Sequence, residues 1–290
     1  MKYGVFSVSM PEYDIAETVA LLKEVGYDGV EWRVNQIPKE VPENIPFEGR
    51  YWINCRSTLD ITRIGEEAKR AKALCDEAGI EIFSLTSYLT PDKTEEIESI
   101  LKAAQSIGCG MMRVFTPNFP VKENYRRLFD ETLSHTRTLE GLAKKYGVKI
   151  VYELHGDNIL ASPSSAYRMV SGFDPNYIGV IFDPGNMVYE GNENYRKGFE
   201  LLGDHLAHVH VKNSLWQENG RDELGSKKWK RCWAPLWDGQ ADLHELFKIM
   251  KETGYSGKVS VEDFSNETST RDKLIQNLAY IKKLEESVGL

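Results

Sequence analysis

Four residues able to bind a metal ion follow apolar, β-branched runs in the second half of the chain. The runs are "VYELHG", "VIFDPGN", "AHVHVKN" and "VSVEDFS", and the residues are Glu153, Asp183, His210 and Glu262. Burying a charged group is costly unless a partner compensates it, so a carboxylate at the end of an apolar run requires an explanation. Three carboxylates and one imidazole, without a thiolate, favour Mn²⁺, Mg²⁺ or Co²⁺ over a structural zinc ion.

The alternation of side chains along a strand places these candidates on a common face. Successive residues point to opposite faces, so Glu153 shares a face with His155, and His210 shares one with His208 and Lys212. If these faces line one barrel, the four candidates converge at its mouth. A single acid at a strand end is more often a helix cap or half of an ion pair, but four such residues on consecutive strands are an uncommon coincidence.

Other polar residues have the same strand parity and are expected to be structural. We expect His208 to be a hydrogen-bonded core histidine, because it lies deeper in its strand than His210. We interpret Glu31, Arg33 and Arg113 as a charge network inside the barrel rather than as catalysts.

The elements that must position these residues form a repeat along the whole chain. Short apolar runs alternate with longer stretches of helical period, and junctions such as "EAGIEIFSL" and "KYGVKIVYEL" place a glycine where a helix would end. The predicted strands are residues 3–9, 28–33, 80–87, 110–116, 148–154, 178–183, 207–212 and 258–263. The predicted helices are residues 14–25, 60–78, 92–106, 122–146, 163–172, 194–202, 241–253 and 269–286. This alternation predicts an α/β fold, a single (β/α)8 TIM barrel formed by residues 1–290.

The main alternative to a barrel is an open, doubly wound sheet. Such a sheet normally carries a glycine-rich phosphate loop after its first strand, and "SVSMPEYD" contains no glycine. Two connections, residues 34–59 and 213–240, are too long to be plain turns. We expect both to be long loops on the active-site face, serving as substrate walls, lids or a dimer contact.

The composition limits the classes of partner. A net charge of −8 argues against nucleic acid or an anionic membrane as the main partner. Cys55, Cys75, Cys109 and Cys232 are widely spaced without a CxxC pair, which is typical of reduced thiols. The N-terminus lacks the apolar region of a signal peptide, and no apolar run is long enough to span a membrane. We therefore expect a cytoplasmic protein with no nucleic-acid or membrane partner.

With these features the chain resembles the xylose isomerase-like TIM barrels, also described as sugar phosphate isomerases/epimerases. The resemblance runs from "GYDGVEWR" through "FDPGN" and "HVHVKN" to "SVEDF", and its most specific part is the ordered Glu, Asp, His, Glu set. It implies one divalent metal ion per chain, Mn²⁺ first, with Mg²⁺, Co²⁺ or Zn²⁺ as alternatives. It also suggests a homodimer or homotetramer. The implied ligands are Glu153, Asp183, His210 and Glu262.

The resemblance predicts a sugar isomerase or epimerase. In the epimerase branch, the positions that match Glu153 and Glu262 also exchange protons with the substrate on its opposite faces, which makes both catalytic candidates. A metal that bridges a carbonyl and a neighbouring hydroxyl oxygen stabilises the enediolate formed when the α-proton leaves. The expected substrate is therefore a small polyhydroxy carbonyl compound, and the sequence leaves open whether it is phosphorylated.

Further residues are expected to contact the substrate. We expect His155 and Asn186 to contact its oxygens, and Lys212 to bind a carboxylate, phosphate or enediolate oxygen, although a salt bridge to a nearby acid explains Lys212 equally well. Aromatic residues could form apolar walls around a sugar or pack in the core. They are Trp216, which we also expect to contact the substrate, together with Trp237, Trp32, Tyr88 and Phe115.

Three alternative functions compete with an isomerase or epimerase. A dehydratase, as in inosose dehydratase, would remove the same α-proton and then expel a β-hydroxyl. Endonuclease IV is disfavoured, because its zinc site is rich in histidine, whereas this acidic chain has six histidines and places Asn186 where that enzyme has a ligand. A catalytically silent sugar-binding protein stays open, although the intact ligand set argues against it.

Overall fold

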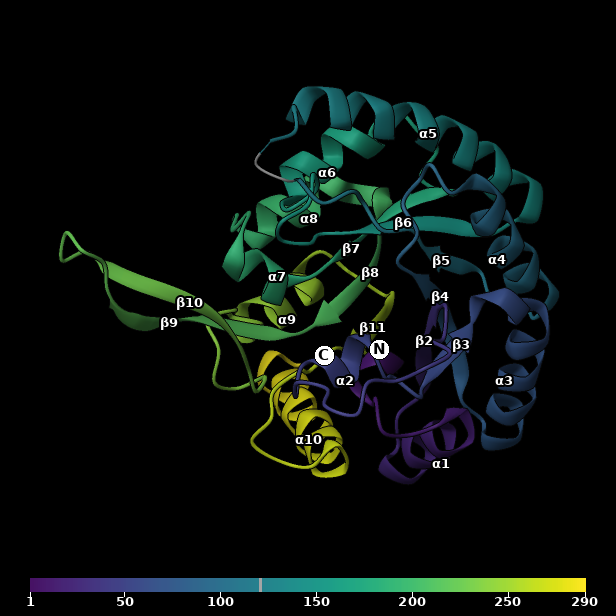
Figure 1. The fold of residues 1–290 in the computed structure, drawn as a ribbon, viewed down its shortest axis with the longest axis horizontal. Coiled ribbons are helices and arrows are strands. Elements are labelled where there is room, and N and C mark those ends of the chain that lie inside the picture. The colour runs from purple at the N-terminus through teal and green to yellow at the C-terminus, as the bar shows by residue number, and fades with distance from the viewer. Residues whose placement is uncertain (120–121) are drawn as a thin grey trace.

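The computed structural model describes residues 1–119 and 122–290, and it contains a closed barrel of eight parallel strands surrounded by helices (Figure 1). β1 pairs with β2 on one side and with β11 on the other, which closes the barrel. The predicted (β/α)8 architecture is therefore confirmed. The barrel strands are β1 (Lys2–Phe6), β2 (Gly29–Asn35), β4 (Glu81–Ser87), β5 (Met111–Arg113), β6 (Lys149–Glu153), β7 (Ile178–Phe182), β8 (Leu206–Val211) and β11 (Lys258–Val261).

The helices begin and end where the sequence supplies caps. Asp14 accepts from the backbone N–H of Glu17, whose side chain accepts from the Asp14 N–H, and this capping box starts α1. Glycines in the left-handed conformation end α1, α3, α5 and α10. The helices are α1 (Ile15–Val25), α2 (Gly49–Trp52), α3 (Ile64–Ala78), α4 (Thr94–Ser106), α5 (Tyr125–Tyr146), α6 (Pro163–Val170), α7 (Pro184–Tyr189), α8 (Tyr195–Leu202), α9 (Leu243–Glu252) and α10 (Thr270–Val288).

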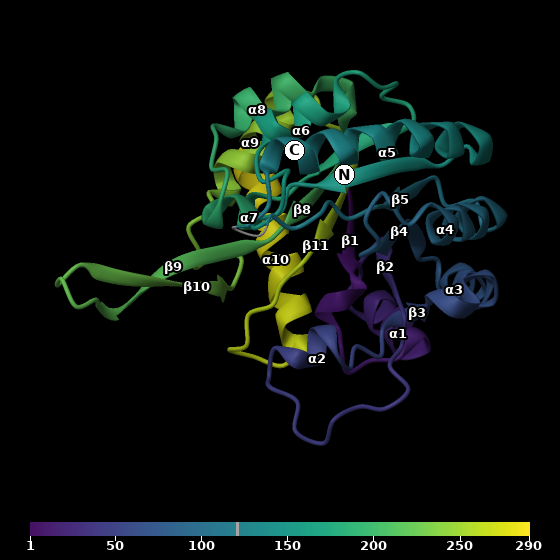
Figure 2. The same ribbon diagram turned by 45° about the horizontal axis from the view of Figure 1, so that its top comes forward.

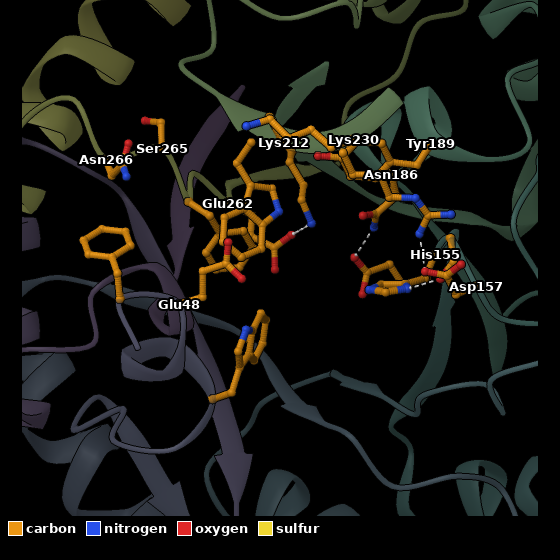
Figure 3. A pocket seen from close by; sticks show the side chains of 18 of the residues that line it. Glu48, His155, Asp157, Asn186, Tyr189, Lys212, Lys230, Glu262, Ser265 and Asn266 are labelled. Atoms are coloured by element: carbon orange, nitrogen blue, oxygen red, sulfur yellow. Dashed lines mark hydrogen bonds and ion pairs between the residues drawn. The ribbon is translucent and has the colours of Figure 1, made fainter. Parts of the chain in front are cut away.

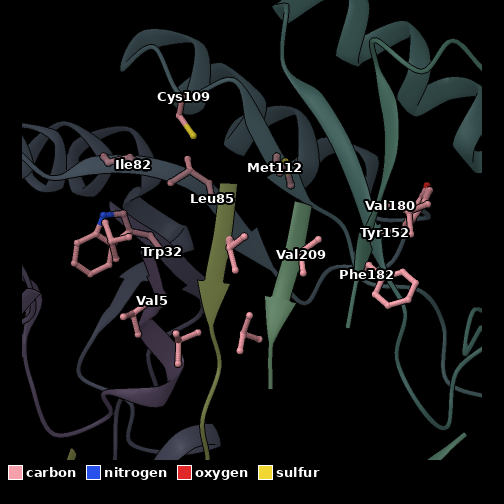
Figure 4. Close-up of a cluster of buried hydrophobic side chains, with 14 of the residues drawn as sticks. Val5, Trp32, Ile82, Leu85, Cys109, Met112, Tyr152, Val180, Phe182 and Val209 are labelled. Carbon is pink, nitrogen blue, oxygen red and sulfur yellow. The ribbon is translucent and has the colours of Figure 1, made fainter. Parts of the chain in front are cut away.

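The largest apolar core fills the space between the strands and the outer helices (Figure 4). Trp32 is fully buried there, so of the two roles expected for it, a substrate wall or core packing, it has the second. Its neighbours in the strand, Glu31 and Arg33, are buried as well and take the opposite face. Inside the barrel, the ring of Phe83 occupies the space that a side chain at Gly29 would need.

The two long connections differ in structure. Residues 34–59 carry α2 and the first residues of β3 (Thr58–Asp60), which pairs with the end of β2. Residues 213–240 were expected to be a loop, but most of them form an antiparallel hairpin of β9 (Asn213–Arg221) and β10 (Lys227–Ala234). Figures 1 and 2 show this hairpin projecting away from the barrel. Its turn is fixed by Asp222, whose carboxylate accepts from the N–H groups of Leu224 and Ser226.

All four cysteines are free thiols, as the sequence predicts. Among the residues that the structure describes, no helix combines the length and apolar character needed to cross a membrane.

Candidate functional site

Four neighbouring strands deliver the predicted metal ligands to one point. Glu153 ends β6, Asp183 follows β7, His210 lies near the end of β8 and Glu262 follows β11. All four are buried, and one ligand atom from each lies within 4.8 Å of the others. The structure therefore brings together the whole set chosen from the sequence.

The "DPGN" segment fixes the carboxylate of Asp183. Its Oδ1 accepts from the Asn186 backbone N–H at 2.8 Å, which makes it the N-cap of α7, and Pro184 occupies the first turn. The Asn186 side-chain amide donates to Oδ2, also at 2.8 Å. A Cβ at Gly185 would lie 2.6 Å from Cγ of Lys212, so a glycine is needed for this close approach.

His210 presents different partners to its two ring nitrogens. Nε2 lies 3.0 Å from Oε2 of Glu31, and Nδ1 lies 3.3 Å from Oε1 of Glu153 and 3.6 Å from Oδ2 of Asp183. If Nε2–H donates to Glu31, the Nδ1 lone pair points at the two carboxylates, and Nδ1 has no hydrogen-bond partner among the described residues. A histidine that binds a metal through one ring nitrogen usually donates its other ring N–H to a carboxylate or a similar acceptor. Glu31 has that position beside His210.

Glu31 therefore has a more specific role than the structural charge network expected from the sequence, because it supports His210. Thr86 donates to its Oε1 at 2.5 Å, and Nε2 of His208 lies 3.3 Å from its Oε2. Burial opposes its ionisation, but His210 and His208 hold the pKa of the Glu31 carboxyl well below its usual range. The prediction of a core role for His208 is consistent with its 2.9 Å contact to the hydroxyl of Ser260. The side chain of Arg33 instead bonds to Thr58 and to a backbone oxygen of residues 34–59.

Glu153 is paired with Arg113 in a buried salt bridge. The Asn186 amide also lies 3.1 Å from its Oε1. Burial alone would raise the pKa of Glu153, but the Arg113 guanidinium, followed by His210, holds it well below the usual value for a glutamate. Glu153 is therefore ionised at neutral pH.

Glu262 lies in a different electrostatic environment. Burial raises its pKa, and the Glu153 charge adds to this effect against the opposing charge of Lys212. Lys212 Nζ lies 2.5 Å from Glu262 and 3.7 Å from Asp183, and although burial opposes its charge, these acids raise its pKa. Glu262 thus keeps a proton more readily than Glu153, as expected of a pair with separate roles in proton transfer.

The charge balance of the site fits a divalent cation. Burial disfavours a protonated His210, yet the surrounding acids, Glu31 first, raise its pKa well above the ordinary value, which reports an excess of negative charge. The oxygen-rich donor set and the unpartnered Nδ1 of His210 fit the same cation. The contact network contains four buried carboxylates and two lysine or arginine cations. The carboxylates are Glu31, Glu153, Asp183 and Glu262, and the cations are Arg113 and Lys212.

Two of the four candidate ligands, Glu153 and Glu262, line a cavity of about 650 Å³, a volume typical of small-molecule sites. In Figure 3, Lys212 and Glu262 lie between one side that carries Ser265 and Asn266 and another that carries His155. Aromatic side chains form part of the wall. They are Phe47, Trp52, Tyr88, Tyr189, Trp233 and Phe264.

His155 and Asn186, the residues expected to contact substrate oxygens, both line this cavity. Nδ1 of His155 lies 2.7 Å from the backbone oxygen of Gly156, and burial lowers the His155 pKa. A neutral ring that donates from Nδ1 leaves Nε2 as an acceptor for a substrate hydroxyl. The amide nitrogen of Asn186 is already used to bridge Glu153 and Asp183, so this residue holds two candidate ligands in place.

The predicted aromatic walls require correction. Trp216 turns its indole N–H to the backbone oxygen of Val188 at 3.0 Å, so it supports α7 instead of lining the cavity. Trp237 is 47% exposed and packs on Tyr280, away from the cavity, and Phe115 also lies outside its lining. Trp52 and Trp233 were missed, although the aromatic content of the two long connections was the signal for them.

Comparisons with known proteins agree with this architecture. A family model for the xylose isomerase-like TIM barrel matches residues 19–284. Inosose dehydratase from Bacillus licheniformis is 28% identical over 145 residues, which are 48% of this chain and 47% of that protein, so the chain spans about half the length of the curated relatives it matches.

Solved structures show the same fold at low sequence identity. A 3-keto-D-glucoside 4-epimerase from E. coli is 19% identical with a TM-score of 0.68, covering 98% of this chain and 99% of that one. The IolI protein with a bound zinc atom is 16% identical with a TM-score of 0.70, covering 99% of both chains. Since the family model spans nearly the whole barrel, the chain belongs to the xylose isomerase-like TIM barrel family.

Proposed function

We propose that this protein is a divalent-metal-dependent isomerase or epimerase that acts on a small polyhydroxy carbonyl compound. The observation that carries the proposal is the convergence of Glu153, Asp183, His210 and Glu262 within 4.8 Å, in a cluster of which Glu153 and Glu262 line a cavity. Buried carboxylates in such a cluster need a cation, and the cavity has room for a sugar beside it.

The two catalytic candidates divide the proton transfer between them. A divalent ion held by the four ligands would act as a Lewis acid that stabilises negative charge on substrate oxygens. Glu153, which Arg113 holds ionised, accepts the proton next to the carbonyl group. Glu262, whose pKa is raised, returns a proton on the other face of the substrate. His155 accepts from a substrate hydroxyl, and Lys212 donates to a substrate oxygen.

A dehydratase is the second candidate, because the matched curated relatives include inosose dehydratases. The same proton removal by Glu153 would then be followed by loss of a hydroxyl group from the next carbon. Lys212, which lies in the cavity with a proton to give, would be the donor to that leaving group.

Deuterium exchange tests the proposal. Protein loaded with Mn²⁺ is incubated in D₂O with D-tagatose, D-allulose, L-ribulose or an inosose, and the sugars are analysed by NMR and mass spectrometry. We expect incorporation of deuterium next to the carbonyl, lost in Glu153→Gln and retained in the matched control Glu98→Gln on α4. Loss of water would select the dehydratase, and no exchange with any of these compounds would contradict both enzymes.

A further inference from the structure

Two hydrogen-bond donors on the cavity wall have no partner among the described residues. They are Nη2 of Arg113 and the hydroxyl of Tyr88, and both atoms are shielded from bulk solvent. Both residues line the cavity that ends on Glu153 and Glu262. Native proteins nearly always supply an acceptor for a buried donor, because leaving it unpaired costs free energy. A ligand oxygen in the cavity would supply that acceptor.

The guanidinium of Arg113 cannot turn to find another partner. Nη1 donates to Glu153, and Nε donates to the backbone oxygen of Ser87 at 3.3 Å. The group also lies over three rings, with its Cζ 4.7 Å from the ring centre of Tyr88 and 5.2 Å from that of Phe6. Because the guanidinium is planar, hydrogen bonds at two of its nitrogens also fix the position of the third. Nη2 and the Tyr88 ring therefore form one rigid corner of the cavity.

The charges around this corner favour an uncharged oxygen. Glu153 already compensates the charge of Arg113, so the corner offers donors without an unmatched positive charge. Elsewhere in the lining, Arg231 of β10 is paired with Asp157, and the lining also carries one further lysine, Lys230, and one further acid, Glu48. A hydroxyl or carbonyl oxygen satisfies two such donors, whereas a phosphate would bring two negative charges to a site where carboxylates already outnumber the lysine and arginine cations.

We propose that Arg113 and Tyr88 together bind one oxygen of an uncharged ketose, on a carbon next to the one that faces Glu153. The assignment of that carbon rests on the proposed function, in which Glu153 takes the proton. The guanidinium of Arg113 would then hold both the base, Glu153, and the substrate, so that their relative position is set by a single rigid group. Arg113 is accordingly a substrate-binding residue and not only part of a structural charge network.

Calorimetric titration of Mn²⁺-loaded protein with D-tagatose, D-allulose and L-ribulose tests this proposal. In Tyr88→Phe we expect the Kd to rise about 3- to 10-fold, as for loss of one hydrogen bond, with no fall in Tm because the hydroxyl has no partner within residues 1–119 and 122–290. Arg113→Lys keeps a positive charge beside Glu153 but lacks the fork, and it should weaken binding at least as much. For a sugar that is turned over, KM should rise while kcat changes little in Tyr88→Phe.

Tyr152→Phe is the matched control, because its hydroxyl contacts Thr136 in the core at 2.8 Å. It should lower Tm and leave the Kd unchanged. Unchanged binding in both Tyr88→Phe and Arg113→Lys would overturn the proposal, as would a wild type that binds none of the three sugars. The wild type could instead bind D-tagatose 6-phosphate more tightly than D-tagatose, with this difference lost in Arg113→Lys. That result would overturn the proposal that the bound oxygen is uncharged.

The outcomes separate this inference from the proposed function. Weakened sugar binding in Tyr88→Phe without any deuterium exchange by the wild type would support the donor pair and contradict the enzyme. Deuterium exchange by the wild type with an unchanged Kd and KM in Tyr88→Phe would support the enzyme and contradict the donor pair.

Discussion

The candidate role of His210 as a metal ligand depends on the carboxylate that contacts its other ring nitrogen. Glu31 lies 179 residues earlier in the chain, yet its carboxylate faces Nε2 of His210 and thereby leaves Nδ1 facing Glu153 and Asp183. Support of this kind fixes both the tautomer and the direction of a metal-binding imidazole. The inward parity of Glu31 was visible in the sequence, but its partner was not, because barrel closure brings these two strands together only in space.

Replacing Glu31 should therefore weaken metal binding without removing a ligand. We expect Glu31→Gln to lower the Mn²⁺ affinity about 10- to 100-fold, the usual effect of losing such support. Isothermal titration calorimetry measures this affinity directly. Glu67→Gln on α3, a buried acid paired with Arg63, is the control and should bind Mn²⁺ like the wild type. Equal affinities for Glu31→Gln and wild type would show that Glu31 does not orient His210.

Gly185 should resist even the smallest side chain. Its Cβ would meet the side chain and backbone of Lys212, so Gly185→Ala must displace either α7 or the lysine. We expect a loss of roughly 1–3 kcal/mol in the free energy of unfolding, as for other overpacked sites. Gly172→Ala, where a Cβ meets no atom within 4 Å, is the matched control. Urea denaturation compares the free energies of unfolding of the two variants. Equal stability would contradict the close contact between Gly185 and Lys212.

At the scale of the elements, the strands and helices were predictable and the hairpin was not. Alternation of apolar runs with helical periods depends on local sequence, and each predicted strand lies on an observed one. The expected loop at 213–240 was wrong because most of β9 and β10 is exposed and so lacks the apolar run by which buried strands are recognised. Trp216 of β9 was expected at the cavity and does not line it, since the pairing of β9 with β10 decides which of their aromatic residues reach the cavity.

The outer part of the hairpin should be dispensable for the metal centre. Glu218 and Trp229 are paired across the two strands, so residues 219–228 can be replaced by Asn-Gly, a turn suited to a short hairpin. The base, which includes Cys232 and Trp233 of the cavity wall, remains. We expect the shortened protein to fold and to bind one Mn²⁺ per chain with wild-type affinity. Loss of Mn²⁺ binding in the folded variant would assign the tip a role in the site.

At the scale of the whole molecule, the barrel concentrates acidic charge at one end of its interior. The strands β6, β7, β8 and β11 are neighbours in the barrel, each adds one candidate ligand, and all four ligands are buried. Family membership and the fold follow from the sequence repeat. The predicted dimer or tetramer and the cytoplasmic location stay predictions, because they depend on surfaces and partners outside one chain.

Metal removal should destabilise the whole barrel. Without a cation the buried acids repel one another, and a ligand that binds only the folded state stabilises it by about 2.7 kcal/mol at 100 times its Kd. We expect chelation by EDTA to lower Tm and added Mn²⁺ to restore it, measured by scanning calorimetry. His210→Ala should have a Tm that does not respond to Mn²⁺. A wild type whose Tm is the same with EDTA and with Mn²⁺ would contradict a resident ion.

Anomalous diffraction from crystals grown with Mn²⁺ tests directly whether the four carboxylate and histidine side chains hold a metal ion. Data collected at the manganese absorption edge locate the ion independently of any assumption about its ligands. We expect one anomalous peak per chain, bound by Glu153, Asp183, Nδ1 of His210 and Glu262. No peak within reach of these four residues, or a peak held by other residues instead, would contradict it.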